Sequence, residues 1–267
     1  MLRETWALTV RELKHWYRAK IQIFMMLIQP IVWLGLFGQA FPQGTIPISF
    51  LNGAPDYMSY MSVGQLAIIS LFTCMFVGMS LVWDRRFGFL NKLRASPISR
   101  ASIPISRVLA TVIRAVVAAM LVLIIALLFA HIPGLKGLTI TGNFGVPEFL
   151  GVILILGLLA TAFASIFVAI ALTIKQQETL FAVINLVNLP LMFASAALFP
   201  VSSMPDWLQA VAKVNPLTLA VDGIRQLMFS GSSGIYPLST DILGLLVFSV
   251  VFIILGIFIA MRALKEK

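Results

Sequence analysis

Six long apolar runs alternate with short polar segments along the chain, at about residues 21–41, 57–83, 104–131, 149–174, 179–199 and 241–262. A helix needs about 20 mostly apolar residues to cross the hydrocarbon core of a bilayer. With a rise of about 1.5 Å per residue, each run is long enough to cross. The pattern therefore predicts an all-α membrane protein with six transmembrane helices.

The first twenty residues mix apolar and charged side chains with helical spacing. The apolar ones recur every three or four residues, at Trp6, Val10, Leu13 and Tyr17. This spacing is typical of an amphipathic helix that lies in the plane of the membrane surface. We expect residues 1–20 to form such an interface helix, with Trp6, Arg11 and Lys14 at the surface, and residues 21–267 to form the transmembrane domain. A cytoplasmic extension of the first span is the alternative.

The segment 200–237, before the last run, contains the start signals of two further helices. Asn215 before Pro216 is typical of a helix start, and each predicted helix has only about 9–15 residues, too few to cross a bilayer. We expect two amphipathic outer helices that lie at the interface or are re-entrant. Asp222 and Arg225 are three residues apart and are expected to pair on the second helix.

Positive charges gather at alternate ends of the apolar runs. With the N-terminus inside, fifteen of the 19 Lys and Arg residues fall on the inner side and three on the outer side. This excess predicts that both termini are cytoplasmic, and it accounts for the net charge of +9 without nucleic acid. Arg114, inside the third run, is the remaining cation. A snorkelling or interhelical contact is the simpler interpretation of Arg114, and a substrate contact is the alternative.

Several amide side chains interrupt the apolar runs. Asn185 and Asn188 are three apart and are expected to share a helix face, and Gln29 precedes a proline near the middle of the first run. Amides commonly hold spans together through hydrogen bonds worth about 0.6–2 kcal/mol. The alternative is a polar lining of a transport path. We take Gln29, Trp33, Asn185 and Asn188 as candidates for a translocation path or a dimer seam.

The sequence lacks the residues of most catalytic sites. It has no G-x-x-x-x-G-K-[ST] motif for nucleotide phosphates, and its single cysteine and two histidines are too widely separated for a metal cluster. We therefore expect no enzyme activity, metal or cofactor in this chain. Its carboxylates lie outside the predicted spans or at their ends and none lies at mid-membrane, which argues against a carrier driven by an ion gradient. Any uphill transport would draw its energy from another subunit.

The inner segment 83–100, "WDRRFGFLNKLRASPISR", combines basic residues with large apolar ones. A short helix there would present Phe89, Leu90 and Leu93 as one patch, and Gly88 allows a turn before it. Such a helix can lie on lipid or fill a groove in a partner protein.

This inner segment, the outer stretch "ALFPVSSMPDWLQAVAKVNPLTLAVDGIRQLMFSG" and the layout of six spans together resemble one known family. They are similar to the permease subunits of ATP-binding-cassette exporters of type 2, which include daunorubicin-type drug exporters and polysaccharide exporters. One position departs from the resemblance, because Asn91 stands where that family often has Glu.

The resemblance implies a cytoplasmic coupling loop, residues 84–103, whose short helix sits in a groove of a separate ATPase subunit. The implied contact residues are Phe87, Gly88, Phe89, Leu90, Leu93 and Arg94. ATP and Mg would be bound by that partner. Two permease chains and two ATPases would form the complex in a prokaryotic inner membrane, with the first and fifth spans near the dimer seam.

The cargo class follows from the polar residues of the spans. A path lined by amides and apolar groups, with few fixed charges, favours drugs or other small hydrophobic or amphiphilic molecules. Two alternatives stay open: an exporter of polysaccharide or lipid-linked glycan, and a membrane scaffold that transports nothing.

Overall fold

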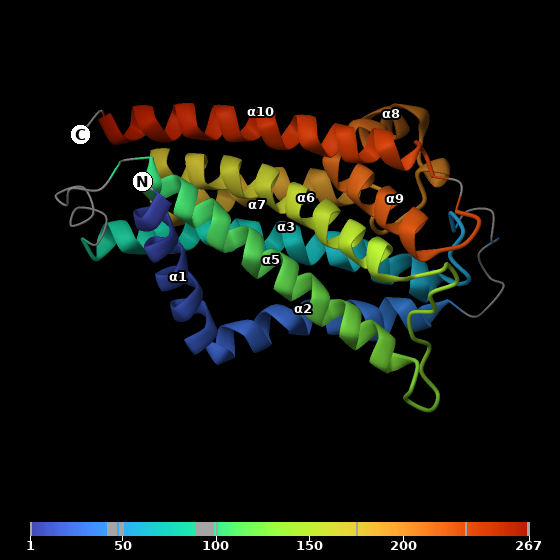
Figure 1. Ribbon diagram of the computed structural model, residues 1–267. Coiled ribbons are helices and arrows are strands. Elements are labelled where there is room, and N and C mark those ends of the chain that lie inside the picture. The colour runs from blue at the N-terminus through green and yellow to red at the C-terminus, as the bar shows by residue number, and fades with distance from the viewer. Residues whose placement is uncertain are drawn as a thin grey trace.

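The computed structural model describes residues 2–41, 47, 51–88, 99, 101–174, 176–232 and 234–265, and the long helices in these ranges run side by side (Figure 1). The helices are α1 (Leu2–Arg18), α2 (Lys20–Ala40), α3 (Tyr57–Arg86), α5 (Ser102–Phe129), α6 (Val146–Thr173), α7 (Gln177–Phe193), the short 3₁₀ helix η2 (Val201–Ser203), α8 (Asp206–Val214), α9 (Pro216–Met228) and α10 (Leu238–Lys265). The expected all-α architecture is confirmed.

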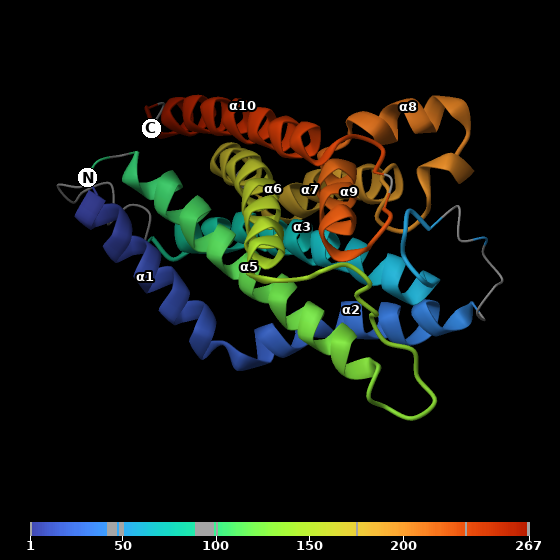
Figure 2. The ribbon, with the colours of Figure 1, turned by 45° about the vertical axis from the view of Figure 1, so that its right-hand side comes forward.

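The connections sort to two ends of the bundle. Figures 1 and 2 place the start of α1, the end of α10, the end of α3 and the start of α5 at one end, and α8 and α9 at the other. Consecutive long helices therefore alternate in direction, as the expected crossings require. We call the end that holds both termini the inner end.

Five helices are long and apolar enough to cross a membrane: Lys20–Ala40, Tyr57–Asp84, Ser102–Phe129, Val146–Thr173 and Leu238–Ile259. The remaining expected span is α7, a shorter apolar helix of 17 residues, which measures about 25 Å at 1.5 Å per residue. It ends at Phe193 and not near residue 199, as the apolar run predicted.

The early end of α7 is stabilised by side chains from other helices. Asn215 donates from Nδ2 to the carbonyl oxygens of Leu191 and Ala194, at 2.8 and 2.6 Å. The hydroxyl of Tyr60 donates to the Ala196 carbonyl at 3.0 Å, and Ala196 N donates to a threonine hydroxyl of α9 at 3.0 Å. Irregular backbone at membrane depth is tolerated where protein groups satisfy it. The turns that follow Phe193 therefore leave few backbone groups without a hydrogen-bond partner.

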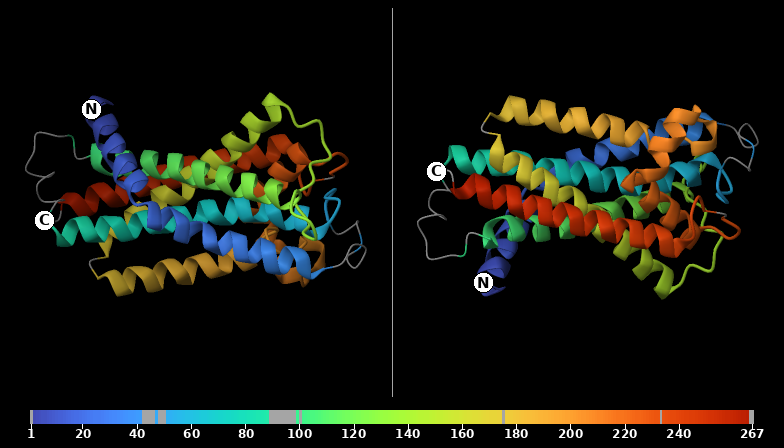
Figure 3. Two further views of the ribbon diagram at one scale, coloured as in Figure 1. Left: turned by 90° about the horizontal axis from the view of Figure 1, so that it is seen from below. Right: turned by 90° about the horizontal axis from the view of Figure 1, so that it is seen from above.

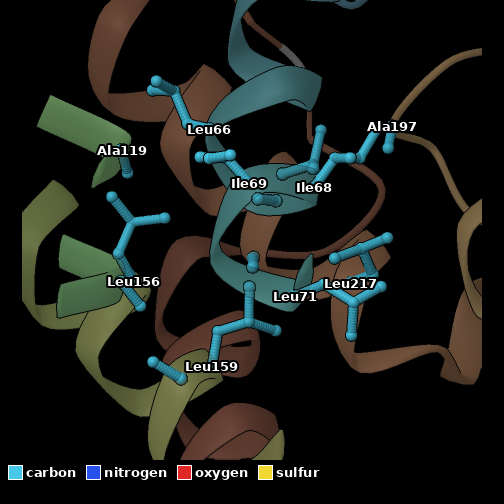
Figure 4. Packing of buried hydrophobic residues seen from close by; sticks show 14 of the residues in the cluster. Leu66, Ile68, Ile69, Leu71, Ala119, Leu156, Leu159, Ala197 and Leu217 are labelled. Carbon is cyan, nitrogen blue, oxygen red and sulfur yellow. The ribbon is translucent and has the colours of Figure 1, made fainter. Parts of the chain in front are cut away.

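Helix α3 forms the centre of the bundle, in contact with α2, α5, α6, α7 and α9. Leu66, Ile68, Ile69 and Leu71 point from it toward neighbours on several sides, including Leu156 of α6 (Figure 4). Such a helix has no lipid-facing stripe over most of its length, because protein surrounds it. Two of its buried hydroxyls turn back to their own backbone: Ser62 donates to the Met58 carbonyl and Thr73 to the Ile69 carbonyl, both at 2.7 Å.

The two short outer helices differ in burial. In α8, Trp207 is 71 % exposed, as expected of an interfacial helix. Helix α9 is buried from Pro216 to Arg225, between α3, α6 and α10, so it belongs to the core rather than to the surface. The start of α9 was correctly predicted, because the Asn215 side chain accepts a hydrogen bond from Leu217 N at 2.9 Å.

Helix α1 packs against α5 through polar side chains. Thr5, Thr9 and Glu12, which share one face of α1, are its buried residues, whereas Trp6 is 58 % and Tyr17 71 % exposed. The aromatic side chains therefore point away from the protein, as a helix lying on lipid requires. The sequence did not indicate that the polar face is the one held by the protein.

The outer edges of the bundle are apolar. Helix α10 exposes Val247, Ile254 and Phe258, and α2 exposes Ile21 and Leu36. Figure 3 shows α7 at one edge of the bundle in both views, next to α3. These surfaces suit a hydrocarbon environment, since their side chains are apolar and helical hydrogen bonds pair most of the backbone polar groups.

We expect Gly64→Ala to destabilise the fold, because a Cβ atom there would overlap the backbone carbonyl of Ala197. Overpacking against backbone costs about 1–3 kcal/mol. The measurement is thermal unfolding of the purified protein in detergent. Gly157→Ala is the control, since open space surrounds that position. A Gly64→Ala variant as stable as the control would contradict the packing of α3 on the turns after α7.

Candidate functional site

The expected coupling loop leaves α3 at the inner end. Phe87 N donates to the Trp83 carbonyl at 2.9 Å, and the Phe87 side chain is 83 % exposed. Gly88 follows with φ +71°, a left-handed conformation that glycine adopts without strain and that agrees with the predicted turn. Phe89, Leu90, Leu93 and Arg94 lie outside the described residues. The exposed Phe87 is thus the described part of the expected apolar patch.

A buried arginine joins three helices beside this loop. Arg107 of α5 is 4 % exposed and donates from Nη1 to Glu12 of α1 at 2.7 Å and to Ser80 of α3 at 3.2 Å. Its Nη2 forms an ion pair with Asp84, near the end of α3. We call Glu12, Ser80, Asp84 and Arg107 the Arg107 clamp. Because charges buried in low dielectric hold their partners closely, the clamp fixes α1 to both helices that border the loop.

Helix α1 also contacts the far end of the loop. Glu4 accepts hydrogen bonds from Ser99 N and from the Ser102 hydroxyl, both at 3.3 Å. The Ser99 N–H lowers the pKa of the Glu4 carboxyl below its usual value, because that hydrogen bond favours the charged form. The Thr9 hydroxyl adds a 3.4 Å contact to the Ser106 carbonyl. Ser99, Ser102 and Ser106, on the far side of the loop, are therefore held by α1.

The other two predicted interface residues lie on the exposed side of α1. Arg11 donates to Glu12 at 3.0 Å, and Lys14 is exposed. Sequence reasoning assigned Arg107 only to the inner positive charges. The signal that could have identified it is a single arginine a few residues inside an apolar run, which needs an anionic partner.

The four predicted path or seam residues occupy different environments. On α2, Gln29 and Trp33 are half-buried, and Trp33 stacks on Phe37 with ring centroids 4.6 Å apart. On α7, Asn188 is buried and donates to the Met75 sulfur at 3.1 Å, whereas Asn185 is half-buried and donates to its own helix. Asn188 therefore packs against α3, and the two amides do not form one polar face within a single chain.

The expected ion pair between Asp222 and Arg225 is not formed, although both side chains are described. The Arg225 guanidinium lies over the Tyr60 ring, 3.5 Å from its centroid, and donates from Nη2 to the Tyr60 carbonyl at 3.0 Å. Asp222 instead accepts from Tyr236 N at 3.2 Å and from Gln226 at 3.4 Å. Because α9 is buried, its charges contact groups of the surrounding protein: Arg225 ties α9 to α3, and Asp222 ties it to the segment that leads into α10.

Asp241 completes this outer cluster and was not among the predicted residues. It is fully buried at the start of α10 and accepts from Gln226 Nε2 at 2.9 Å. One amide thus bridges Asp222 and Asp241. The sequence feature that could have identified Asp241 is an acidic residue in the first turn of the last span. Across the described residues, no group of three or more His, Cys, Asp or Glu side chains has the arrangement of a metal site.

We expect Arg107→Gln to lower stability by about 3–5 kcal/mol, because it leaves buried carboxylates without their cation. The measurement is thermal unfolding in detergent, together with the rate at which protease releases α1. Arg11→Gln is the matched control: Arg11 contacts the same Glu12, but its side chain is 45 % exposed, and such pairs are worth about 0–1 kcal/mol. Equal effects of the two substitutions would contradict the clamp.

Comparison with known proteins identifies relatives of this chain. The chain is 31% identical to the "Putative transport permease ycf38" of Porphyra purpurea over 226 residues, which cover 84% of this chain and 74% of that protein. It is 27% identical to the "Probable doxorubicin resistance ABC transporter permease protein DrrC" of Mycobacterium tuberculosis (strain CDC 1551 / Oshkosh), over 90% of this chain and 80% of that protein.

A third relative is the "Daunorubicin resistance ABC transporter permease protein DrrB1" of Streptomyces coeruleorubidus, 24% identical over 81% of this chain and 71% of that protein. Residues 3–229 match the ABC-2 type transporter family, a range that contains α1, the clamp and α9. The chain therefore belongs to the ABC-2 type transporter family, as a membrane-embedded transport permease and not an enzyme.

Proposed function

We propose that this chain is the transmembrane subunit of an ATP-driven exporter, coupled to separate ATPase subunits through residues 84–103. The observation that supports this most directly is the Arg107 clamp, which lies beside both ends of that loop. A force applied to the loop would reach α1, α3 and α5 together, because one buried guanidinium holds all three. ATP and Mg would be bound by the ATPase, since this sequence has no phosphate-binding loop.

The mechanism follows from that rigid connection. ATP binding would close the two ATPases and displace the loops seated on them. The nucleotide shifts the balance between inward- and outward-open states only by its different affinity for the two. The clamp moves α1, α3 and α5 as one body, and α9, tied to α3 by Arg225, carries the movement to the outer end.

We propose that two copies form the translocation path, with α2 and α7 near the seam. Both helices contact α3, and both expose large apolar side chains, such as Leu36 at 64 % and Leu186 at 74 %. The exposed Phe76 of α3 belongs to the same flank. Where these apolar faces meet across a twofold axis, α2 and α7 of both copies would border the path. The apolar and amide side chains of these helices would then line it, as the sequence indicates.

The proposed cargo is a small hydrophobic or amphiphilic molecule. Two relatives carry names that refer to doxorubicin or daunorubicin resistance, which supports this class over a glycan. The proposed location is a prokaryotic inner membrane with both termini cytoplasmic, supported by the inner excess of Lys and Arg and by the common end of the two termini.

We expect Leu90→Asp with Leu93→Asp, and separately Phe87→Asp, to reduce copurification of the co-expressed ATP-binding-cassette ATPase by at least about tenfold. Each buried apolar side chain contributes roughly 1.5–3 kcal/mol to such a contact. The matched control is Ile132→Asp with Leu135→Asp, the same change at the same spacing in an exposed loop of the outer end. Unchanged copurification in the inner variants would refute the coupling loop.

Transport itself is tested in vesicles that contain the chain and the ATPase. We expect daunorubicin movement that depends on ATP. Movement driven by an ion gradient without ATP would identify a carrier instead. An ATPase that binds the chain, hydrolyses ATP and moves no tested compound would favour the scaffold.

The seam is tested with Leu186→Cys in a Cys74→Ser background, which removes the one native thiol. A short bismaleimide is expected to link two chains in native membranes. Val247→Cys on α10, also well exposed, is the control and is expected to stay monomeric. Linkage through residue 247 but not through residue 186 would place the seam on the opposite side of the bundle.

A further inference from the structure

A cavity of about 910 Å³ lies near the inner end, where α1 turns into α2. Figures 1 and 2 show the two helices meeting at an elbow beneath α5, with α3 behind. Residues of α1, α2, α3 and α5 line the cavity. Its volume lies at the upper end of the range of about 300–1,000 Å³ that holds drug-sized ligands.

The cavity has a cationic side. Arg18 and Lys20 line it at the elbow, and Arg114 of α5 lines it further along the span. Glu12 is the one carboxylate in the lining, and it already accepts from Arg107 and Arg11. The cavity therefore carries a net positive charge that the described residues do not neutralise.

Arg114 is the centre of this imbalance. Its Nε donates to the Ala110 carbonyl at 3.2 Å, whereas its buried Nη2 has no hydrogen-bond partner. Glu12 attracts the Arg114 guanidinium electrostatically, but its carboxylate forms its ion pairs with Arg107 and Arg11. Arg107, seven residues earlier on the same helix, binds two carboxylates and a hydroxyl. An arginine inside a span without a counterion is costly and is typical of a ligand site.

The rest of the lining is apolar. Met25, Met26, Phe76 and Met79 form much of the wall. Ile21 and Met25 are 76 % and 59 % exposed, so the apolar wall continues onto the exposed face of α2. A ligand with an acidic head at Arg114 and an alkyl tail along α2 would match both the cationic and the apolar parts of the lining. Basic pockets between spans on the cytoplasmic side commonly bind acidic lipid head groups.

We propose that this cavity binds an anionic amphiphile, with its acidic head at Arg114 and its hydrocarbon tail against Met25, Met26 and Phe76. The ligand is either an acidic phospholipid of the surrounding leaflet or an acidic cargo molecule. The site lies within one chain, and binding of a phospholipid there needs neither the ATPase nor a second copy; the cargo alternative alone rests on the proposed export function.

The test is native mass spectrometry of the purified chain with added dioleoyl phosphatidylglycerol or dioleoyl phosphatidylcholine, which share acyl chains and differ in head-group charge. We expect tighter binding of phosphatidylglycerol, and a loss of about five- to tenfold in that preference for Arg114→Gln, because one head-group cation is removed. Arg114→Lys keeps the charge and is expected to keep most of the preference.

Lys213→Gln, which removes an exposed cation from α8 at the outer end, is the matched control and should leave binding unchanged. If Arg114→Gln does not fold, Arg18→Gln with Lys20→Gln replaces it, and the same loss of preference is expected. Equal binding of the two lipids by the native chain, or full preference in the cavity variants, would overturn the proposal.

A further experiment distinguishes a phospholipid from a cargo molecule as the ligand. Dodecyl phosphate, a single-chain anion, is added in competition with phosphatidylglycerol. Stronger binding of the phospholipid identifies a lipid site, and stronger binding of the single-chain anion identifies a cargo site. Failure of both to compete with each other would show that they do not share the cavity and would overturn the assignment.

Discussion

Hydrocarbon offers no hydrogen bonds, so each polar group that this bundle buries must find its partner within the protein. The turns after α7 show how strongly this constraint acts. Tyr60 of α3 and Asn215 before α9 satisfy carbonyl groups that an ended helix leaves free. The position of α9 in the core and the length of α7 are therefore two consequences of one set of hydrogen bonds.

Three buried or half-buried arginines meet this constraint to different degrees. Arg107 has carboxylates on two other helices, and Arg225 has the face and the carbonyl of Tyr60. Both of them connect helices, one near each end of the bundle. Arg114 has a carbonyl of its own helix and an adjacent cavity. The difference separates structural cations from the one that is available to a ligand.

These connections give the proposed transport cycle a physical basis. A permease without its own energy source needs an inner contact that receives movement and a stiff route that transmits it. Asp84 and Ser99 lie near the two ends of the loop. Asp84 contacts Arg107 of α5, and Ser99 contacts Glu4 of α1. Helix α3 extends from this end to Tyr60, where Arg225 attaches α9. The proposed route is thus one central helix, α3, with a charged contact near each end.

The sequence by itself determined which segments are apolar helices, where α1 and α9 begin, and which family the chain belongs to. These features depend on hydrophobicity, spacing and capping over a few neighbouring residues, so they can be read locally. The turn at Gly88 was predictable for the same reason, because a glycine can take a positive φ without strain.

Only the tertiary structure decided which polar side chains meet. Glu12 and Arg107 are 95 residues apart, and Tyr60 and Arg225 are 165 apart. Local spacing predicted a pair between Asp222 and Arg225, but in the folded chain Arg225 contacts Tyr60 of α3, and Asp222 accepts from Gln226 of its own helix and from Tyr236 N. The polar face of α1 and the cavity at Arg114 likewise depend on how separate helices pack, because an ion pair or a cavity between helices leaves no periodic signal in the sequence of either one.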